Sequence, residues 1–154
     1  MTARPIFWFF SGVALSVVFA TIAGDRVIAQ TRGAGSSLIL VAPTDMKWEP
    51  TARPDTARFN LWGDSSKGPF AYFTRYDSGW QLPLHFHTND LQGVIVSGTF
   101  VIHVKGQPEK QLSAGSYFFV PGKTQHTDAC ASGPACVVYF SGEAPLDRIN
   151  VEDK

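Results

Sequence analysis

The feature that most constrains this chain is a regular alternation of short apolar runs with turn residues. Each run spans four to seven residues and is closed by Gly, Pro, Asp or Ser. No window longer than about ten residues carries a helical period after the N-terminal segment, whereas many short strands separated by turns are typical of an all-β barrel or sandwich. The expected strands are residues 59–62, 70–76, 82–87, 93–97, 99–104, 116–120, 125–129 and 135–140. We therefore expect residues 38–151 to form one antiparallel β domain behind a flexible leader, residues 30–37.

Composition and charge narrow the class of partner. With 154 residues, 44% of them apolar and 17% charged, the chain is large enough to bury a core and too apolar to be disordered. Thirteen basic residues balance thirteen acidic ones. Such a chain has no overall field that attracts nucleic acid or an anionic membrane surface, so we expect a small-molecule ligand and no nucleic acid.

The N-terminus has the pattern of a secretory signal peptide. Arg4 is the only charge before residues 6–23, a stretch that contains none. Small residues follow, and they predict cleavage after Ala29, with Ala23 as the alternative site. Residues 1–29 are then removed, and the mature chain is periplasmic or secreted without a stable membrane span. A retained anchor is the remaining alternative, because a run of about 18 apolar residues can nearly cross a bilayer.

Two cysteines, Cys130 and Cys136, are the only ones in the chain. In an oxidising compartment an even pair is more often a disulfide than a reactive thiol. Gly133 and Pro134 lie between them and can bend the chain enough to join two strand ends. A competing interpretation makes Cys130 a metal ligand.

The histidines point to a metal site. His85 and His87 are one residue apart, so on a strand both imidazoles leave on the same face and can grip one ion. A third histidine, His126, follows a second β-rich segment. The fourth, His103, alternates with the apolar residues of its strand, and we expect it on the surface. Two histidines with this spacing are by themselves a weak indication of a metal site, and the surrounding sequence strengthens it.

The same segments resemble the two motifs of the cupin superfamily. The first motif is matched by Gly79, His85, His87 and Gly98, and the second by Gly115, Pro121 and His126. The resemblance covers about residues 70–140 and implies a double-stranded β-helix, a small jelly-roll barrel. Gly98 and Gly115 fall where tight turns favour a residue free to take positive φ.

The resemblance is incomplete at one metal ligand. The family's glutamate falls on Leu91 or Gln92, depending on the spacing, and neither is a carboxylate. Three histidines still suffice for a metal, and the resemblance implies a site of His85, His87 and His126 with Gln92 as fourth ligand. Asp90 is an alternative fourth ligand, and a barrel that has lost its metal is another reading. Without the glutamate, Fe, Ni, Zn, Cu, Co or Mn is favoured over Mg or Ca.

The apolar strand residues around such a site can be interpreted in two ways. Strand residues can form an apolar pocket wall or plain barrel core, and these are Phe70, Tyr72, Trp80, Leu84, Phe118, Val120 and Tyr139. Lys123, near the third histidine, is either a charge at the pocket mouth or a solvated turn residue.

Three functions follow from this reading. The first is an exported cupin that binds a divalent transition metal and acts on or binds a small organic molecule, as a dioxygenase-like enzyme if it is catalytic. No separate general base is evident, so whether the protein is an enzyme stays open. The alternative is a non-catalytic cupin that binds or senses a small molecule or metal. A third is an assembly role, because cupins often form homodimers through edge strands and residues 38–41 suggest such an edge.

Overall fold

Strands make up nearly all the regular structure of residues 37–151, the part of the chain that the computed structural model describes. In chain order the elements are the 3-10 helix η1 (Pro43–Asp45), β1 (Glu49–Pro50), β2 (Thr56–Gly63), β3 (Phe70–Tyr76), β4 (Gln81–Phe86), β5 (Leu91–Ser97), β6 (Thr99–Val104), β7 (Lys110–Ser113), β8 (Tyr117–Val120), β9 (His126–Cys130), β10 (Cys136–Gly142) and β11 (Ile149–Asn150). The prediction of an all-β domain is confirmed.

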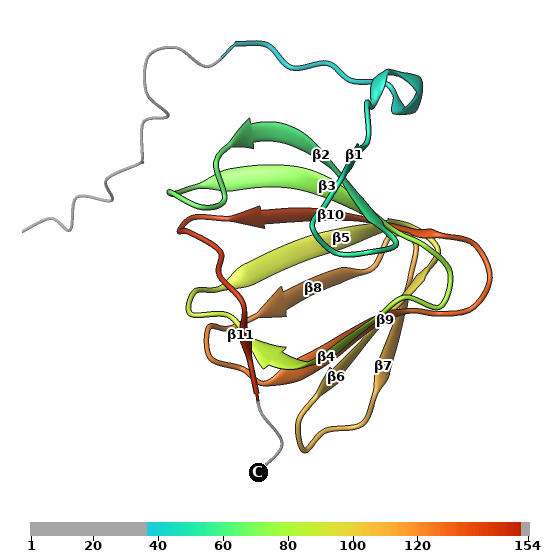
Figure 1. The fold of residues 1–154 in the computed structure, drawn as a ribbon, viewed down its shortest axis with the longest axis vertical. Coiled ribbons are helices and arrows are strands. Elements are labelled where there is room, and N and C mark those ends of the chain that lie inside the picture. Colours follow the sequence, from blue (N-terminus) through green and yellow to red (C-terminus); the bar gives the residue numbers. More distant parts are fainter. Residues whose placement is uncertain (1–36, 152–154) are drawn as a thin grey trace, which may run out of the picture. The chain divides into compact units, whose positions relative to one another are not determined.

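The strands form two antiparallel sheets that face each other (Figure 1). One sheet has the order β1-β2-β3-β10-β5-β8 and the other the order β11-β4-β9-β6-β7. The chain passes from one sheet to the other at β3–β4, β4–β5 and β5–β6, which is the connectivity of a jelly roll. The expected cupin-type barrel is therefore the observed architecture.

The interior between the sheets is aromatic. Strand β3 shows why the chain folds this way, since Phe70, Tyr72 and Tyr76 are buried at alternate positions while Arg75 between them is exposed. Rings from both sheets meet in this core, as in the pair Tyr76 and Phe100, whose centroids are 5.3 Å apart. Alternation thus closes the two sheets over a common core, and it also determines which residues face the site.

Eight strands were expected, and each coincides with an observed strand to within a few residues at its ends. The three missed strands are β1, β7 and β11, and each lies at the edge of its sheet. Their residues are mostly exposed and carry no apolar alternation, so no periodic pattern marks them. Residues 38–41 form no strand, and Leu38 is 85% exposed. Pairing of two copies through this segment stays a prediction.

The expected positive φ at two turn glycines and the expected exposure of His103 are both observed. Gly98, between β5 and β6, has φ +77°, and a Cβ there would come within 2.8 Å of the backbone at Ala135 and Cys136. Gly115 has φ +85°. His103 is exposed on β6, as expected.

The N-terminal predictions fall outside the described residues. These are the signal peptide, residues 1–29, and most of the leader, residues 30–37. The compact unit that includes the barrel begins at Leu38. Within residues 37–151, no helix has the length and apolar character of a membrane span.

Candidate metal centre

Three histidines converge inside the barrel. His85 on β4 lies directly opposite His126 on β9 in the antiparallel register, and their ring centroids are 4.3 Å apart. His87 follows the last residue of β4, with its ring centroid 5.0 Å from that of His85 and 5.4 Å from that of His126. One nitrogen from each ring lies within 4.8 Å of the other two. The structure thus brings together the three histidines that the sequence analysis assigned to a metal site.

An irregularity in β4 turns the pair inward. Leu82 pairs with Asp128 and His85 pairs with His126, so three steps on β4 match two on β9. The extra residue is a β-bulge in the segment that contains Pro83, which has no N–H to give to the ladder. Because of this bulge, Leu82 and His85 both point inward although a regular strand would place them on opposite faces.

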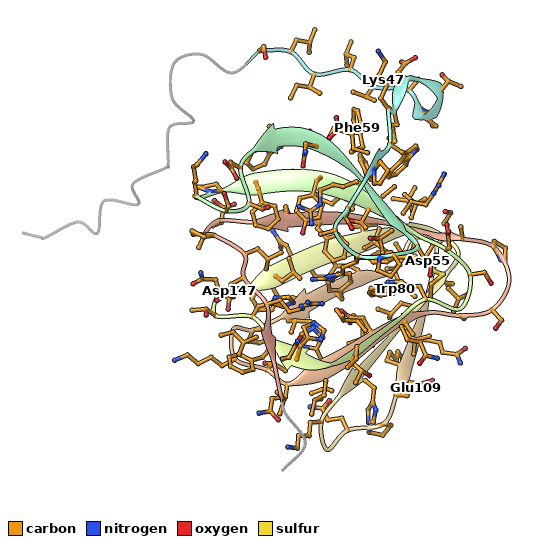
Figure 2. All side chains as sticks on the ribbon, in the orientation of Figure 1. Lys47, Asp55, Phe59, Trp80, Glu109 and Asp147 are labelled. Carbon is orange, nitrogen blue, oxygen red and sulfur yellow. A yellow bond between two sulfur atoms is a disulfide. The ribbon has the colours of Figure 1, made fainter. Side chains whose placement is uncertain are left out.

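Each imidazole is oriented by a backbone carbonyl. The contacts are His85 Nδ1 to Pro83 O at 2.8 Å, His126 Nδ1 to Thr124 O at 2.8 Å, and His87 Nδ1 to Asp147 O. A carbonyl only accepts, so Nδ1 carries the proton in all three rings and Nε2 of each neutral ring keeps its lone pair. Such an outer contact fixes the ring and the tautomer of a metal-binding histidine. Figure 2 shows Asp147 on the segment between β10 and β11.

Burial favours the neutral form of His85 and His87. The loss of hydration on burial lowers the pKa of His85 to about 3 and also lowers the pKa of His87, against the opposing effect of their backbone hydrogen bonds. Neutral imidazole is the form that binds a metal. Nε2 of His85 is fully buried and has no hydrogen-bond partner among the described residues. The lone pair of this nitrogen is buried, and no hydrogen-bond donor among the described residues reaches it.

A carboxylate that was not identified from the sequence, Asp128, lies beside two of the three histidines. Asp128 Oδ2 lies 3.6 Å from His85 Nε2 and 3.8 Å from His126 Nε2, which is longer than a hydrogen bond. Burial raises the pKa of Asp128 to about 6. Asp128 lies two residues after His126 on β9, and residues two apart on a strand share a face. The spacing argument that paired His85 with His87 could therefore have paired His126 with Asp128.

The expected fourth ligand is elsewhere. Gln92 lies on the face of β5 opposite the buried Leu91 and Gly93; its amide donates to Ser141 Oγ at 3.3 Å and accepts from Tyr117 Oη at 2.9 Å. The structure therefore does not bring Gln92 to the histidines.

The alternative ligand Asp90 has another role. Its Oδ1 accepts the N–H of Gly122 at 2.7 Å. This bond ties the turn after His87 to the turn before His126. Lys123 is exposed in the second of these turns and is a solvated turn residue.

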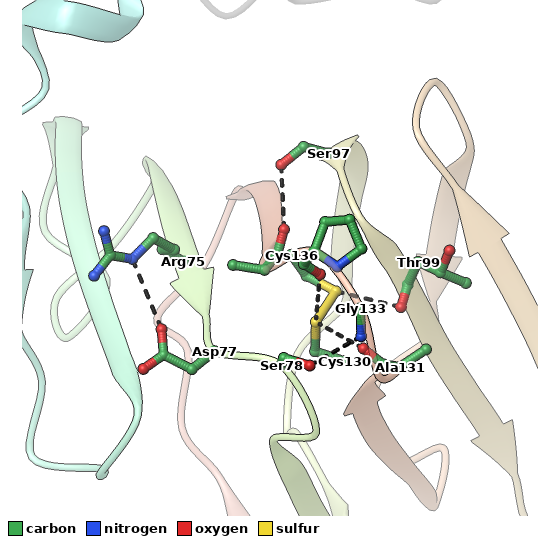
Figure 3. The surroundings of a disulfide bond; sticks show 11 residues. Arg75, Asp77, Ser78, Ser97, Thr99, Cys130, Ala131, Gly133 and Cys136 are labelled. Carbon is green, nitrogen blue, oxygen red and sulfur yellow. Dashed lines mark hydrogen bonds and ion pairs between the residues drawn. A yellow bond between two sulfur atoms is a disulfide. The ribbon is translucent and has the colours of Figure 1, made fainter.

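The two cysteines form the expected disulfide. Cys130 ends β9 and Cys136 begins β10, so the bond links the two sheets across a Cα–Cα distance of 5.8 Å (Figure 3). The intervening turn is held by a hydrogen bond from Gly133 N to Ser78 Oγ. Because its sulfur is in the disulfide, Cys130 is not a metal ligand.

A cavity of about 470 Å³ opens beside the histidines. His85, His87 and Asp128 form its floor, and residues 49–53 and 146–148 supply much of its rim. Of the seven side chains considered as pocket wall, Tyr72 lines the cavity and also belongs to the core, and Phe70, Trp80, Phe118 and Val120 belong to the core alone. Leu84 and Tyr139 are half-buried and line neither the cavity nor the core. Three arginines, Arg53, Arg58 and Arg148, also line it and were not identified from the sequence.

Comparisons with known proteins agree with this architecture. A sequence model of the ChrR cupin-like domain family matches residues 36–146. No curated protein matches the chain. Among solved structures, the polyketide cyclase RemF from Streptomyces resistomycificus has a TM-score of 0.65 at 18% identity, over 77% of this chain and 88% of that chain. An RmlC-like cupin from Shewanella frigidimarina has a TM-score of 0.54 at 26% identity, over 68% and 91%.

A third similar structure comes from a regulatory complex. It is a chain in the structure of Rhodobacter sphaeroides SigE in complex with the anti-sigma ChrR, with a TM-score of 0.52 at 16% identity. The match covers 66% of this chain and 51% of that one. At this identity, as for the polyketide cyclase, the similarity concerns the fold.

Proposed function

The chain belongs to the ChrR cupin-like domain family, and on that premise we propose that His85, His87 and His126 bind one divalent transition metal ion next to a cavity for a small organic molecule. The observation that carries this proposal is the unpaired nitrogen of His85. Its lone pair faces the lone pairs of Asp128 across 3.6 Å, without a hydrogen bond between them. A cation placed among these donors removes both the mutual repulsion and the cost of the buried unpaired atom.

The spacing of the donors suits such an ion. Nitrogen and oxygen ligands about 2.0–2.2 Å from a tetrahedral zinc ion lie about 3.3–3.6 Å from one another. The two distances from Asp128 Oδ2, 3.6 and 3.8 Å, are close to this value. We therefore include Asp128 as the fourth donor, in place of Gln92. Three imidazoles and one carboxylate suit Fe, Ni, Zn, Cu, Co or Mn better than the all-oxygen shells of Mg or Ca.

The bound metal would supply Lewis-acid or redox chemistry at the floor of the cavity. The protein's own groups orient the ligands and limit the access of water. The carbonyls of Pro83, Thr124 and Asp147 hold the imidazole rings, and the buried position of the rings limits the access of water. If the protein is catalytic, a dioxygenase-like reaction on a small organic substrate fits a redox metal beside a cavity.

A second candidate is binding or sensing without turnover. The family is named for ChrR, and one similar structure is that of an anti-sigma ChrR complex, so a regulatory role is a reasonable reading for a relative with the same barrel. Oxygen consumption with phenols and diketones separates the two. Metal-dependent consumption supports the enzyme, and ligand binding without consumption supports the sensor.

Export is part of the proposal. Residues 1–29 have the pattern of a signal peptide, and the Cys130–Cys136 disulfide is the kind of bond that persists in a periplasmic or extracellular setting. Mass spectrometry of the protein from its native host tests this. A mature N-terminus at Gln30 supports cleavage, and an intact N-terminal segment contradicts it.

The metal proposal is tested by elemental analysis of protein purified from its native compartment, because sites of this kind accept the wrong metal on overexpression. We expect one metal ion per chain, and its loss in the His85→Ala/His87→Ala variant. His103→Ala is the control, since this histidine is exposed on β6. Wild-type protein without bound metal, in a buffer free of chelators, contradicts the proposal.

A further inference from the structure

Three arginines share the cavity with the histidines. Arg53, Arg58 and Arg148 all line it, and within residues 37–151 no carboxylate lies at ion-pair distance from any of their guanidinium groups. Arginines at a protein surface need no partner because water solvates them, but these three are gathered around one concave site. The neutral overall composition of the chain gave no sign of this local charge.

Arg58 is the best defined of the three. It lies on β2 opposite Thr74 of β3, on the face that lines the cavity. Its guanidinium stacks on the ring of Tyr72, with Cζ 3.9 Å from the ring centroid. Its Nε is buried and has no hydrogen-bond partner among the described residues. A buried donor of this kind is costly unless a ligand accepts its hydrogen.

Arg53 and Arg148 are placed by structured segments. The N–H of Arg53 donates to Thr51 Oγ1 at 3.1 Å, and its carbonyl accepts from Thr56 Oγ1 at 3.0 Å, so the loop between β1 and β2 is fixed on both sides of this residue. Arg148 lies between Asp147 and the first residue of β11. The carbonyl of Asp147 accepts from His87 Nδ1, which ties this segment to the metal centre.

The three cations lie close enough to act on one another. Burial lowers the pKa of Arg53, and the charges of Arg148 and then Arg58 lower it further. Among the described residues, Asp128 lies near enough for the charge of Arg53 to oppose the rise of its pKa. Glu49 lies opposite Arg58 in the register of β1 and β2. Neither acid forms an ion pair with an arginine of the described chain. Asp147 accepts two hydrogen bonds from Thr88, and Asp128 faces the histidines. Glu49 is exposed on β1 and forms no ion pair with any described residue.

We propose that this cavity binds a small organic carboxylate, whose carboxylate group is held by Arg53 and Arg58 with Arg148 at the rim while its other end reaches the histidines. This inference rests on the proposed function for the metal end of the ligand and deepens it by naming the substrate class. A planar guanidinium matches the two oxygens of a carboxylate. The apolar side chains of Leu82, Leu91 and Phe140 line part of the wall, where an organic body can pack.

Calorimetric titration of the zinc-loaded protein tests the inference. The probes are benzoate and succinate, each compared with its uncharged amide, benzamide and succinamide. We expect at least one carboxylate to bind and its amide to bind about tenfold more weakly or not at all. Arg53→Gln and Arg58→Gln should each weaken the carboxylate about tenfold or more. Arg58→Lys should bind with intermediate strength, because it keeps the charge but not the fork.

Arg75→Gln is the matched control. Arg75 lies on the same sheet as Arg58, but on the exposed face of β3, so its loss should leave carboxylate binding unchanged. Carboxylates that bind no better than their amides, or equally well to wild type and to both cavity variants, overturn the inference. So does phenyl phosphate if it binds more tightly than benzoate, because the site is then built for phosphate.

The metal content of each variant separates this inference from the proposed function. Normal zinc content with arginine-independent carboxylate binding overturns the inference alone. Arginine-dependent carboxylate binding in wild-type protein that takes up no zinc supports the arginine site and contradicts the metal proposal. Circular dichroism of each variant identifies any that fails to fold, and the Arg58→Lys variant then stands in for Arg58→Gln.

Discussion

The ring of His85 is fully buried between the sheets, and its Nε2 has no hydrogen-bond partner among the described residues. Its Nδ1 donates to the carbonyl of Pro83. Because Pro83 is exposed, water can solvate this carbonyl when the imidazole is absent. A histidine kept for core stability would have both nitrogens satisfied. At the level of single residues, the buried Nε2 of His85 is therefore explained by ligand binding and not by packing.

The unpaired nitrogen of His85 predicts how a metal-free variant behaves on unfolding. Replacing His85 with Leu removes one hydrogen bond, worth about 1 kcal/mol, and also an unpaired buried nitrogen that costs about 1–3 kcal/mol. In the metal-free state, His85→Leu should therefore match or exceed the wild type in unfolding free energy, measured by urea denaturation, although it loses metal. Phe100→Ala, in the core, should lose about 3–5 kcal/mol. A loss of similar size for His85→Leu would indicate a structural histidine.

A second prediction at this scale concerns the fourth donor. Asp128→Asn keeps the shape of the side chain but removes the charge that faces His85 and His126. We expect metal affinity to fall about 10–100-fold, measured by competition with a chelator. Gln92→Ala is the comparison and should leave affinity unchanged, because its amide bonds to Ser141 and Tyr117. The reverse order of the two effects would restore Gln92 as ligand.

At the scale of elements, the segment between β10 and β11 acts as a strap on the site. Its Asp147 accepts two hydrogen bonds from Thr88 through the side chain and one from His87 through the carbonyl. Hydrogen bonds from Thr88 lower the pKa of this exposed carboxyl. The strap thus fixes the one histidine that lies outside a regular strand.

Loosening the strap should weaken the metal site without removing a ligand. Asp147→Ala keeps the carbonyl that orients His87 but loses both bonds to Thr88. We expect about a tenfold loss in metal affinity, measured by chelator competition. Asp45→Ala is the control, since that exposed carboxylate accepts from Ala42 N in the 3-10 helix η1 and does not line the cavity. Equal effects of the two substitutions would show that the strap has no role in positioning His87.

The disulfide belongs to the same scale, because it joins the end of β9 to the start of β10. Closing so short a loop should contribute about 2 kcal/mol to the free energy of unfolding. Urea denaturation with dithiothreitol should therefore show the wild type losing about this amount. The Cys130→Ala/Cys136→Ala variant should be less stable from the start and unaffected by the reductant. If the wild type unfolds equally with and without reductant, the bond contributes nothing to stability.

These elements show what the sequence could and could not predict. The long strands were found because apolar alternation marks them, and the short edge strands were missed because they bury little. The histidines were found from their spacing, whereas the bulge was missed, although a proline inside a strand run, here Pro83, indicates a bulge or an edge strand. Gln92 was misplaced by motif counting. Leu91 and Val94 on the two faces of β5 are equally apolar, so alternation did not show which face is buried.

At the scale of the whole molecule, the jelly roll places one site where segments distant in the chain meet. Two histidine strands form the floor of the cavity, and loops from both ends of the domain form the rim. The arginines come from three separate segments, so neither their spacing nor a net charge of zero could have revealed them. The fold itself was predictable from two motifs, because their glycines and histidines set the turns and the interior together.

The central claim is that the imidazoles of His85, His87 and His126 share one metal ion. A crystal of the metal-loaded protein, with data collected on both sides of the absorption edge of that metal, tests it most directly. We expect a single anomalous peak about 2.0–2.2 Å from Nε2 of all three rings, with an oxygen of Asp128 as a further ligand. A peak bound to other residues, or no peak in protein that carries stoichiometric metal, would contradict the account.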